Sequence, residues 1–315
     1  ATWEKLGDIA QDADPKTDLG DGNFAELGKG RLIAVYRRNH AYRTPPAYRI
    51  ESVESSDGGK TWGSPTLVAE SSPQDRNPSR GLWPPFVFVT DRGVVQCYYD
   101  DESTPYAKGF RGHQWVTMKT WSKDSQAWVQ PVTVARAKDL GVLSRDGMPS
   151  VIQADRGRLI CAFESVQATS PHAGCLRVVT SDDNGLTWSW AASDRPILYQ
   201  AKDRRYHAFS PALVRVSRNV LALAFATNED RPEPGISGTP AKELNLDIKL
   251  ILSRDGGRIW PQRAELIHTG KGQNYLPGLT VLRHPGKHPV LISTFLDFHE
   301  GFKSRMKSLD GRRPL

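Results

Sequence analysis

The chain has 315 residues, of which 38% are hydrophobic and 24% are charged, and its formal net charge is +7. It contains no run of about eighteen apolar residues, which excludes a membrane-spanning helix, and no signal peptide is recognisable. The low apolar fraction, with 27 Gly and 22 Pro, favours short half-buried strands between polar turns. The positive charges are scattered rather than clustered, so they indicate neither nucleic acid nor a membrane surface as a partner.

The three cysteines, Cys97, Cys161 and Cys175, have neither metal-ligand spacing nor the pattern of a disulfide framework. Cys97 and Cys161 lie within apolar segments, where we expect them to be buried packing residues. We therefore expect no metal site built from cysteine and no cofactor.

An octet with the pattern Ser-x-Asp-x-Gly-x-Thr-Trp recurs at residues 55–62, 181–188 and 253–260, with a degraded copy at 122–128. Its tryptophans stand at 62, 128, 188 and 260, which gives spacings of 66, 60 and 72 residues. A repeat of this length with turn residues is typical of the four-stranded blades of a β-propeller.

The chemistry of the octet suits a hairpin turn and indicates a structural role. Ser and Asp side chains can bond turn amides, Gly supplies positive φ, and the Trp packs between strands. The pattern resembles the Asp-box, which in proteins that share it lies on outer turns away from the sugar site, so no catalytic role is assigned to it.

A second repeat runs in phase with the octets: a short strand, a turn and then an apolar strand that ends in polar residues. It occurs five times, which predicts an all-β fold, a five-bladed β-propeller in a single domain over residues 1–315. Residues 308–311 form half an octet after the last apolar strand. We expect residues 3–10 to supply the outer strand of the last blade and so hide its edge. The five pairs are 23–27 with 31–36, 83–86 with 94–99, 148–151 with 158–163, 209–212 with 220–225, and 275–278 with 289–295.

The repeats resemble those of the sialidase superfamily, and residues 31–35 followed by the first octet look like a sialidase blade. Sialidases carry an early arginine in a Phe/Tyr-Arg-Ile-Pro stretch, which clamps the substrate carboxylate. The matching residues 21–27 contain no arginine, which argues against a sialidase.

The chain is more similar to the exo-arabinanases of glycoside hydrolase family 93, a family of six-bladed propellers. Residues 145–149 followed by Phe163 and Glu164 resemble the stretch that carries that family's acid/base glutamate. Residues 82–86 followed by 97–101 resemble the stretch that carries its nucleophile. The resemblance implies a secreted enzyme that cleaves an arabinan-like polysaccharide from its end. Pro84 stands where the family has its nucleophilic glutamate, within Trp-Glu-Pro, so another carboxylate must act, the mechanism must differ, or the protein only binds.

Glycoside cleavage needs two carboxyl groups, one acting as acid and the other as base or nucleophile. Glu164 ends an apolar strand, where partial burial would raise its pKa as a general acid requires, and it is the first candidate. Asp100 and Asp101 occupy the corresponding strand end one blade earlier. Strand side chains alternate, so they cannot both face one way, and together with Glu102 they would also suit a Ca²⁺ ion. Asp146 is a further candidate for the base.

Aromatic, basic and polar residues occur at equivalent strand ends and are predicted to bind the substrate. Trp83 would stack on a sugar face. The predicted set consists of Trp83, Arg37, Asn23, His207, Tyr275 and Glu229.

Two other functions remain open at this point. A polysaccharide lyase acting on a uronate would use a Tyr or His base, which Tyr275 and His207 supply, together with an arginine. A non-catalytic sugar-binding propeller would need neither, because fold alone does not imply function. In all three cases the partner is an oligo- or polysaccharide, and we expect a monomer.

Overall fold

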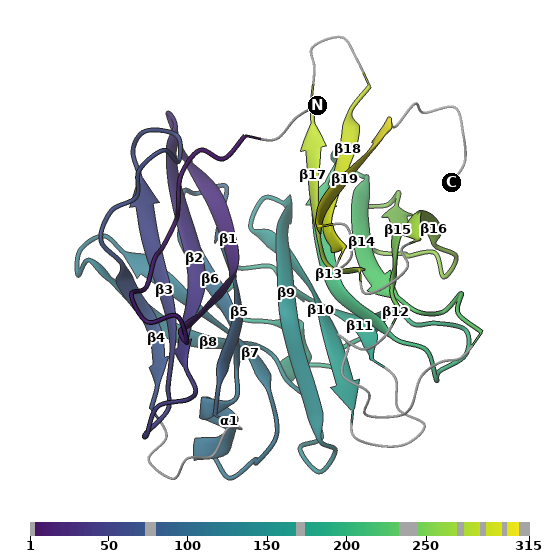
Figure 1. Cartoon of the computed structure of the whole chain (residues 1–315). Helices are drawn as coiled ribbons and strands as arrows, with labels where there is room; N and C mark the ends of the chain where they lie inside the picture. The colour runs from purple at the N-terminus through teal and green to yellow at the C-terminus, as the bar shows by residue number, and fades with distance from the viewer. Residues whose placement is uncertain are drawn as a thin grey trace. The chain divides into compact units, whose positions relative to one another are not determined.

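The computed structural model describes residues 4–72, 80–167, 174–232, 245–269, 274–283, 288–297 and 301–308. These residues form nineteen strands in five successive antiparallel sheets, as the sequence repeats predict, so the protein is an all-β chain with the five-blade arrangement of a β-propeller (Figure 1). It divides into two compact units: residues 1–136, 147–149 and 184–187 form the first, and residues 137–146, 150–183 and 188–315 form the second. That both belong to one domain stays a prediction.

The first unit holds two sheets and the helix α1 (Ser103–Ala107), which lies between β6 and β7. Its buried core takes residues from both sheets, among them Ile33, Ile50, Val87 and Cys97. The strands are β1 (Asp18–Gly28), β2 (Arg31–His40), β3 (Ala47–Ser55) and β4 (Thr66–Ser71), followed by β5 (Leu82–Val89), β6 (Val95–Asp101), β7 (Trp115–Ser122) and β8 (Ala127–Ala135).

The second unit contains most of the third sheet and all of the fourth and fifth. The third sheet consists of β9 (Ser144–Asp155), β10 (Arg158–Gln167), β11 (Cys175–Ser181) and β12 (Ile197–Tyr199), with a short 3₁₀ helix (Ser189–Ala191) before β12. The fourth has β13 (Ala208–Arg215), β14 (Leu221–Thr227), β15 (Asp247–Ser253) and β16 (Glu265–Thr269). The fifth has β17 (Asn274–Leu282), β18 (Val290–Asp297) and β19 (Gly301–Ser308).

The second strand of each sheet is the most apolar. Every residue of β6 and β14 is buried, and Cys97 and Cys161 are fully buried, as expected for packing residues. A large aromatic residue recurs near the end of each second strand, at most 4% exposed, and these five side chains therefore fill equivalent core positions. They are Tyr36, Tyr99, Phe163, Phe225 and Phe295.

The octets at residues 55–62 and 253–260 form the same turn. In the first, Ser55 Oγ lies 2.8 Å from Asp57 Oδ1 and accepts the N–H of Gly59 at 2.9 Å, while Asp57 Oδ1 accepts the N–H of Thr61 at 3.0 Å. The Trp62 indole donates to the Gly59 carbonyl at 3.2 Å. The Thr61 hydroxyl, which donates to Asp57 at 2.6 Å, together with the Thr61 N–H and the Ser55 hydroxyl, holds the pKa of Asp57 well below its usual range. The side chains thus satisfy the turn's own backbone, which explains why this spacing recurs.

The residues before β1 do not form the expected outer strand of the last sheet. Residues 4–10 have no strand conformation, and Ile9 and Ala10 instead pack against Ala34, Tyr36 and Val53 of the first sheet. Among the described residues the last sheet has three strands, β17, β18 and β19. The expectation was wrong because polar contacts made further along this segment hold it on β2 and β3.

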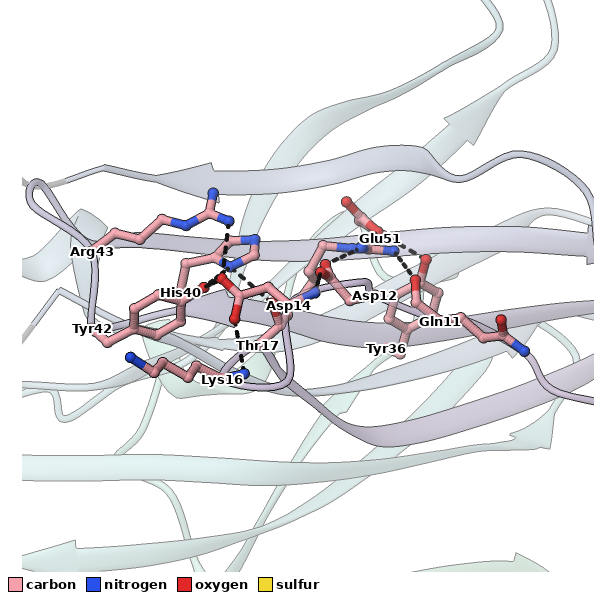
Figure 2. Close-up of polar contacts among 11 residues, drawn as sticks. Gln11, Asp12, Asp14, Lys16, Thr17, Tyr36, His40, Tyr42, Arg43 and Glu51 are labelled. Carbon is pink, nitrogen blue, oxygen red and sulfur yellow. Dashed lines mark hydrogen bonds and ion pairs between the residues drawn. The ribbon is translucent and has the colours of Figure 1, made fainter.

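Those polar contacts centre on Arg38, and Figure 2 shows the residues around it. The Arg38 guanidinium donates to Glu51 at 2.9 Å and to Asp12 at 2.5 Å. Tyr36 donates its hydroxyl to Glu51 at 2.8 Å, and burial raises the pKa of Tyr36 to about 12, so it remains a donor at neutral pH. Thr17 Oγ1 lies 3.1 Å from His40 Nδ1, which extends the contact toward the start of β1.

Side chains on the first strand of one sheet accept hydrogen bonds from backbone N–H groups on the first strand of the next sheet. Asn23 on β1 accepts the N–H of Val87 on β5 at 3.0 Å, and Ser150 on β9 accepts the N–H of Leu213 on β13 at 2.9 Å. A buried N–H of an edge strand needs such an acceptor because it has no ladder partner. Asn23, predicted to bind substrate, therefore has a structural contact.

We expect Asn23→Ala to lower the free energy of unfolding by about 1 to 3 kcal/mol, because the N–H of the buried Val87 would lose its acceptor. Urea unfolding measures this change. Phe24→Ala is the control, since Phe24 is the next residue and is 63% exposed, and it should alter stability by less than about 0.5 kcal/mol. Equal losses in the two variants would show that the amide contact does not stabilise the sheet.

Candidate functional site

The first strand of the sheets carries a β-bulge at a common register. Pairing shifts between Gly20 and Asn23, Trp83 and Pro85, Phe209 and Ala212, and Tyr275 and Gly278. Four non-glycine residues with positive φ lie at these bulges. Three are in β1, β13 and β17, and the fourth is at the equivalent position of β9. They are Asp21, Met148, Ser210 and Leu276, with φ between 48° and 54°. Left-handed backbone is unfavourable for such residues, so each bulge must be held by its surroundings.

Carboxylates at the ends of the second strands bond the N–H groups of two of these bulges. Asp100 and Glu164 each follow the buried aromatic residue of their strand, and the same position in β2 is Arg37. Asp100 accepts the N–H of Met148, and Glu164 accepts the N–H of Ser210. Asp100 and Glu164 thus share one geometry: each accepts an N–H from the bulge in the first strand of the following sheet.

Glu164, the candidate general acid, lies within β10 and is partly exposed. Its Oε2 accepts the Ser210 N–H at 2.8 Å. Burial raises the pKa of Glu164 from 4.5 to about 7, against smaller lowering effects of the Ser210 amide and the Arg145 cation. The carboxyl group therefore holds its proton for a large part of the time near neutral pH, as a general acid must.

Ser210 is the residue beside Glu164 that the sequence reasoning missed. It is 2% exposed, and its Oγ makes no hydrogen bond within the described part of the chain. Its φ is 48°. The place of Ser210 in the repeat, directly before Pro211, is readable from the sequence, but the contact of its N–H with Glu164 is not.

Asp100 is 2% exposed and is held by two donors. Its carboxylate accepts the Met148 N–H at 3.0 Å and the Gln114 side-chain amide at 3.1 Å. A Cβ on Gly147 would overlap both the Gln114 amide nitrogen and Asp100 Oδ2. The Asp-Gly-Met sequence at 146–148 is therefore explained by close approach: only glycine lets the bulge reach Asp100.

Asp101 and Glu102 have structural contacts. Asp101 is 3% exposed and accepts the Thr104 N–H at 2.9 Å and the Thr117 hydroxyl at 3.2 Å, so it holds the start of α1. Glu102 accepts the Gly81 N–H at 2.9 Å. Among the described residues no group of three His, Cys, Asp or Glu side chains could hold a metal ion. Asp101 and Glu102 thus have structural partners, and Asp100 is as deeply buried as they are.

Asp146 does not have the placement of a base. It is completely buried, and Arg195, which is 2% exposed, forms an ion pair with it. Ser165 donates its hydroxyl to the same carboxylate at 2.9 Å. An acid enclosed and paired in this way has no face open to a substrate, so its role is structural.

The predicted binding residues of the first unit form one group. Arg37 forms ion pairs with Asp18, at 3.0 Å, and with Asp21, and its guanidinium lies 5.8 Å from the Trp83 ring centroid. Trp83 is partly exposed, and its edge meets Tyr48 at 5.7 Å between ring centroids. Trp83 keeps the partial exposure that stacking on a sugar requires.

Arg37 stands at the position that Asp100 and Glu164 occupy in the second and third sheets, whereas the fourth and fifth sheets have Ala226 and Leu296 there. The residue at the bulge of β5 is Pro84. Proline has no N–H, so this bulge has no backbone donor at that residue.

His207 and Glu229 are mostly enclosed in the second unit. His207 is 6% exposed, its Nδ1 accepts the Gly174 N–H at 3.0 Å, and its ring stacks on Phe209 with centroids 4.8 Å apart. Glu229 accepts the Tyr199 hydroxyl at 2.7 Å and the Lys249 ammonium at 2.7 Å. These contacts are structural ones. The backbone of Tyr275 lies in β17, and its side chain lies outside the described residues.

Comparison with solved structures identifies the fold. A protein of unknown function from Dyadobacter fermentans aligns with a TM-score of 0.64 and 16% identity over 97% of this chain and 83% of its own. The α-L-arabinofuranosidase of Fusarium graminearum aligns with a TM-score of 0.62 and 16% identity, covering 92% and 80%. The α-L-arabinanase of Penicillium chrysogenum aligns with a TM-score of 0.59 and 17% identity, covering 89% and 72%.

No family model and no curated protein sequence matches the chain. The similarity to the solved structures, at these identities, is one of fold. No helix in the described part of the chain is long and apolar enough to cross a membrane.

The raised pKa of Glu164 predicts a pH dependence of stability. Between about pH 5 and about pH 7 the folded protein binds more protons at Glu164 than the unfolded chain, so the free energy of unfolding should fall as the pH rises through this range. In Glu164→Gln this fall should be smaller. Urea unfolding at a series of pH values measures both, and parallel curves for the two proteins would contradict the raised pKa.

Glu164→Ala separates the structural part of the contact from the electrostatic part. Gln keeps an acceptor for the Ser210 N–H, whereas Ala leaves it without one, at a cost of about 1 to 3 kcal/mol. We expect the Ala variant to be less stable than the Gln variant.

Proposed function

We propose that the protein is a carbohydrate-active enzyme that hydrolyses glycosidic bonds of an arabinan-like polysaccharide, with Glu164 as the general acid. The observation that carries the proposal is the pKa of about 7 at a partly exposed glutamate with a positioned backbone donor. Proton donation to a leaving sugar oxygen is efficient when the pKa of the acid is near the working pH.

The structural neighbours support this substrate class. They include an α-L-arabinanase complexed with arabinobiose and an α-L-arabinofuranosidase in complex with an iminosugar inhibitor. The sequence stretches that resemble glycoside hydrolase family 93 lead to the same class. Action from the chain end and an extracellular location belong to the proposal as further expectations.

Hydrolysis of a glycoside needs a second carboxyl group. Asp100 is the acid at the matching position of its own strand, directly after a buried aromatic residue. Its two donors, the Met148 N–H and the Gln114 amide, orient the carboxylate. Of the two bases predicted for the uronate lyase alternative, His207 is buried and accepts a backbone N–H, and the side chain of Tyr275 lies outside the described residues.

The test is a product screen by mass spectrometry on arabinan, arabinogalactan and a uronate polymer. We expect a neutral sugar from arabinan, and we expect Glu164→Gln to lower kcat/KM by about 10² to 10⁴-fold, since that is the usual contribution of a general acid. The rate should fall as the pH rises above about 7, because the acid must be protonated. Asp100→Asn should also remove turnover.

Asp182→Asn is the matched control, since the Asp182 side chain is 84% exposed on the same unit as Glu164. It should leave the rate unchanged. An unsaturated uronate product would instead establish a lyase. Sugar binding with no product from any substrate would establish a non-catalytic binding protein.

A further inference from the structure

A cavity of about 270 Å³ lies between the fourth and fifth sheets, within the second unit. Its wall is mostly apolar, and residues of this wall also join the two sheets in one buried cluster, which contains Leu250 and Leu291. The apolar lining residues are Leu250, Leu266, Ile267, Leu279, Leu291 and Met306. Glu164 does not line the cavity, so the proposed hydrolysis does not account for it.

A buried hydroxyl group without a partner lines the same cavity. Ser293 is 4% exposed, and its Oγ makes no hydrogen bond with the described residues. It lies on β18, where it pairs with Leu279 of β17 on one side and with Arg305 of β19 on the other. A buried polar group without a partner is unfavourable. A ligand that forms a hydrogen bond with Ser293 would therefore be stabilised.

The packing of the first two sheets contains a place equivalent to this cavity. Positions in different sheets can be matched by counting from the buried aromatic residue of each second strand and following the strand pairing. By this count Ser52, Val68, Val87, Val95 and Cys97 match the lining residues Leu250, Ile267, Leu279, Leu291 and Ser293. The two places are thus built from the same strands of their sheets.

In the first unit an indole side chain packs with these residues. Trp128 of β8 is 6% exposed and belongs to one buried cluster with Val68, Val87, Val95 and Cys97. Its Nε1 donates to Ser52 Oγ at 2.9 Å. Trp128 comes from the outer strand of the second sheet, and the fifth sheet has no outer strand among the described residues. The cavity therefore corresponds to the place of an aromatic ring that is bonded to a serine hydroxyl, with Ser293 supplying the hydroxyl from the opposite sheet.

The size and the charges of the cavity restrict its ligand. An apolar cavity of about 150 Å³ binds benzene, so a cavity of about 270 Å³ has room for two fused rings. Glu265 and Arg305 also line the wall, and their opposite charges favour a neutral ligand over an ionised one. A guanidinium group near an aromatic ring adds a further attraction.

We propose that this cavity binds a small, neutral, planar aromatic compound of two fused rings that donates an N–H to Ser293. Burial of the rings against the apolar wall would supply most of the affinity. The hydrogen bond to Ser293 would select ligands that carry a donor. The inference is independent of the proposed function.

The experiment is calorimetric titration of the whole protein with indole and, in parallel, with benzofuran, which has the same shape but an oxygen in place of the N–H. We expect indole to bind about 2- to 10-fold more tightly, which corresponds to one neutral hydrogen bond. Ser293→Ala should remove this preference and leave the affinity for benzofuran unchanged. Ser217→Ala is the control, because it replaces an exposed serine of the same unit, and it should keep the preference for indole.

A second pair of variants tests where the ligand binds. Leu279→Trp adds an indole to the cavity wall and should abolish binding, whereas Leu282→Trp changes a residue of the same strand that is 40% exposed and lies outside the lining. Absence of indole binding to the wild-type protein, equal affinity for indole and benzofuran, or equal effects of the two tryptophan variants would overturn the inference. Ser293→Ala removes only an unpaired hydroxyl, so it keeps the test decisive if Leu279→Trp does not fold.

Discussion

A strand-end carboxylate that accepts the backbone N–H of a β-bulge is the contact on which the candidate chemistry depends. Asp100 makes it to Met148 in the first unit, and Glu164 makes it to Ser210 in the second. A bulge interrupts the ladder and leaves a donor that must be satisfied elsewhere. The carboxylate satisfies this donor and is itself held in one orientation. The same contact therefore satisfies the donor that the bulge leaves and fixes the orientation of the acid.

The surroundings of this contact differ between Asp100 in the first unit and Glu164 in the second. Asp100 has a second donor, Gln114, and is almost fully buried, whereas Glu164 is partly exposed and its pKa is raised to about 7. A carboxyl group whose charged form is costly is suited to give up a proton. The first sheet lacks this contact, because Arg37 stands at the position of the acid and Pro84, at the bulge of the next sheet, has no N–H.

Much of the fold was predictable from local pattern. The octet at residues 55–62 forms its turn with its own side chains, and the apolar second strands, such as 94–99, are buried as their composition indicates. The position of Glu164 and Asp100 after a buried aromatic was likewise visible. The roles of Asp101 and Asp146 were not, because an acid that caps a helix and an acid that forms a buried ion pair have the same sequence appearance as one that faces a ligand. Arg195, the partner of Asp146, lies far away in the chain.

The sequence by itself determined the number of sheets, the turn chemistry and the strand ends at which charged residues occur, because each depends on residues that are close together in the chain. Only the tertiary structure decided which donors hold each acid: the Ser210 and Met148 amides come from the next sheet, the Thr117 hydroxyl from the neighbouring strand, and the Arg195 guanidinium from a segment 49 residues away in the chain. It also decided that residues 4–10 lie on the first sheet, since the ion pair between Arg38 and Asp12 joins groups that no local pattern connects. Burial and hydrogen bonding set the pKa of a carboxyl group, and both are properties of the packed chain.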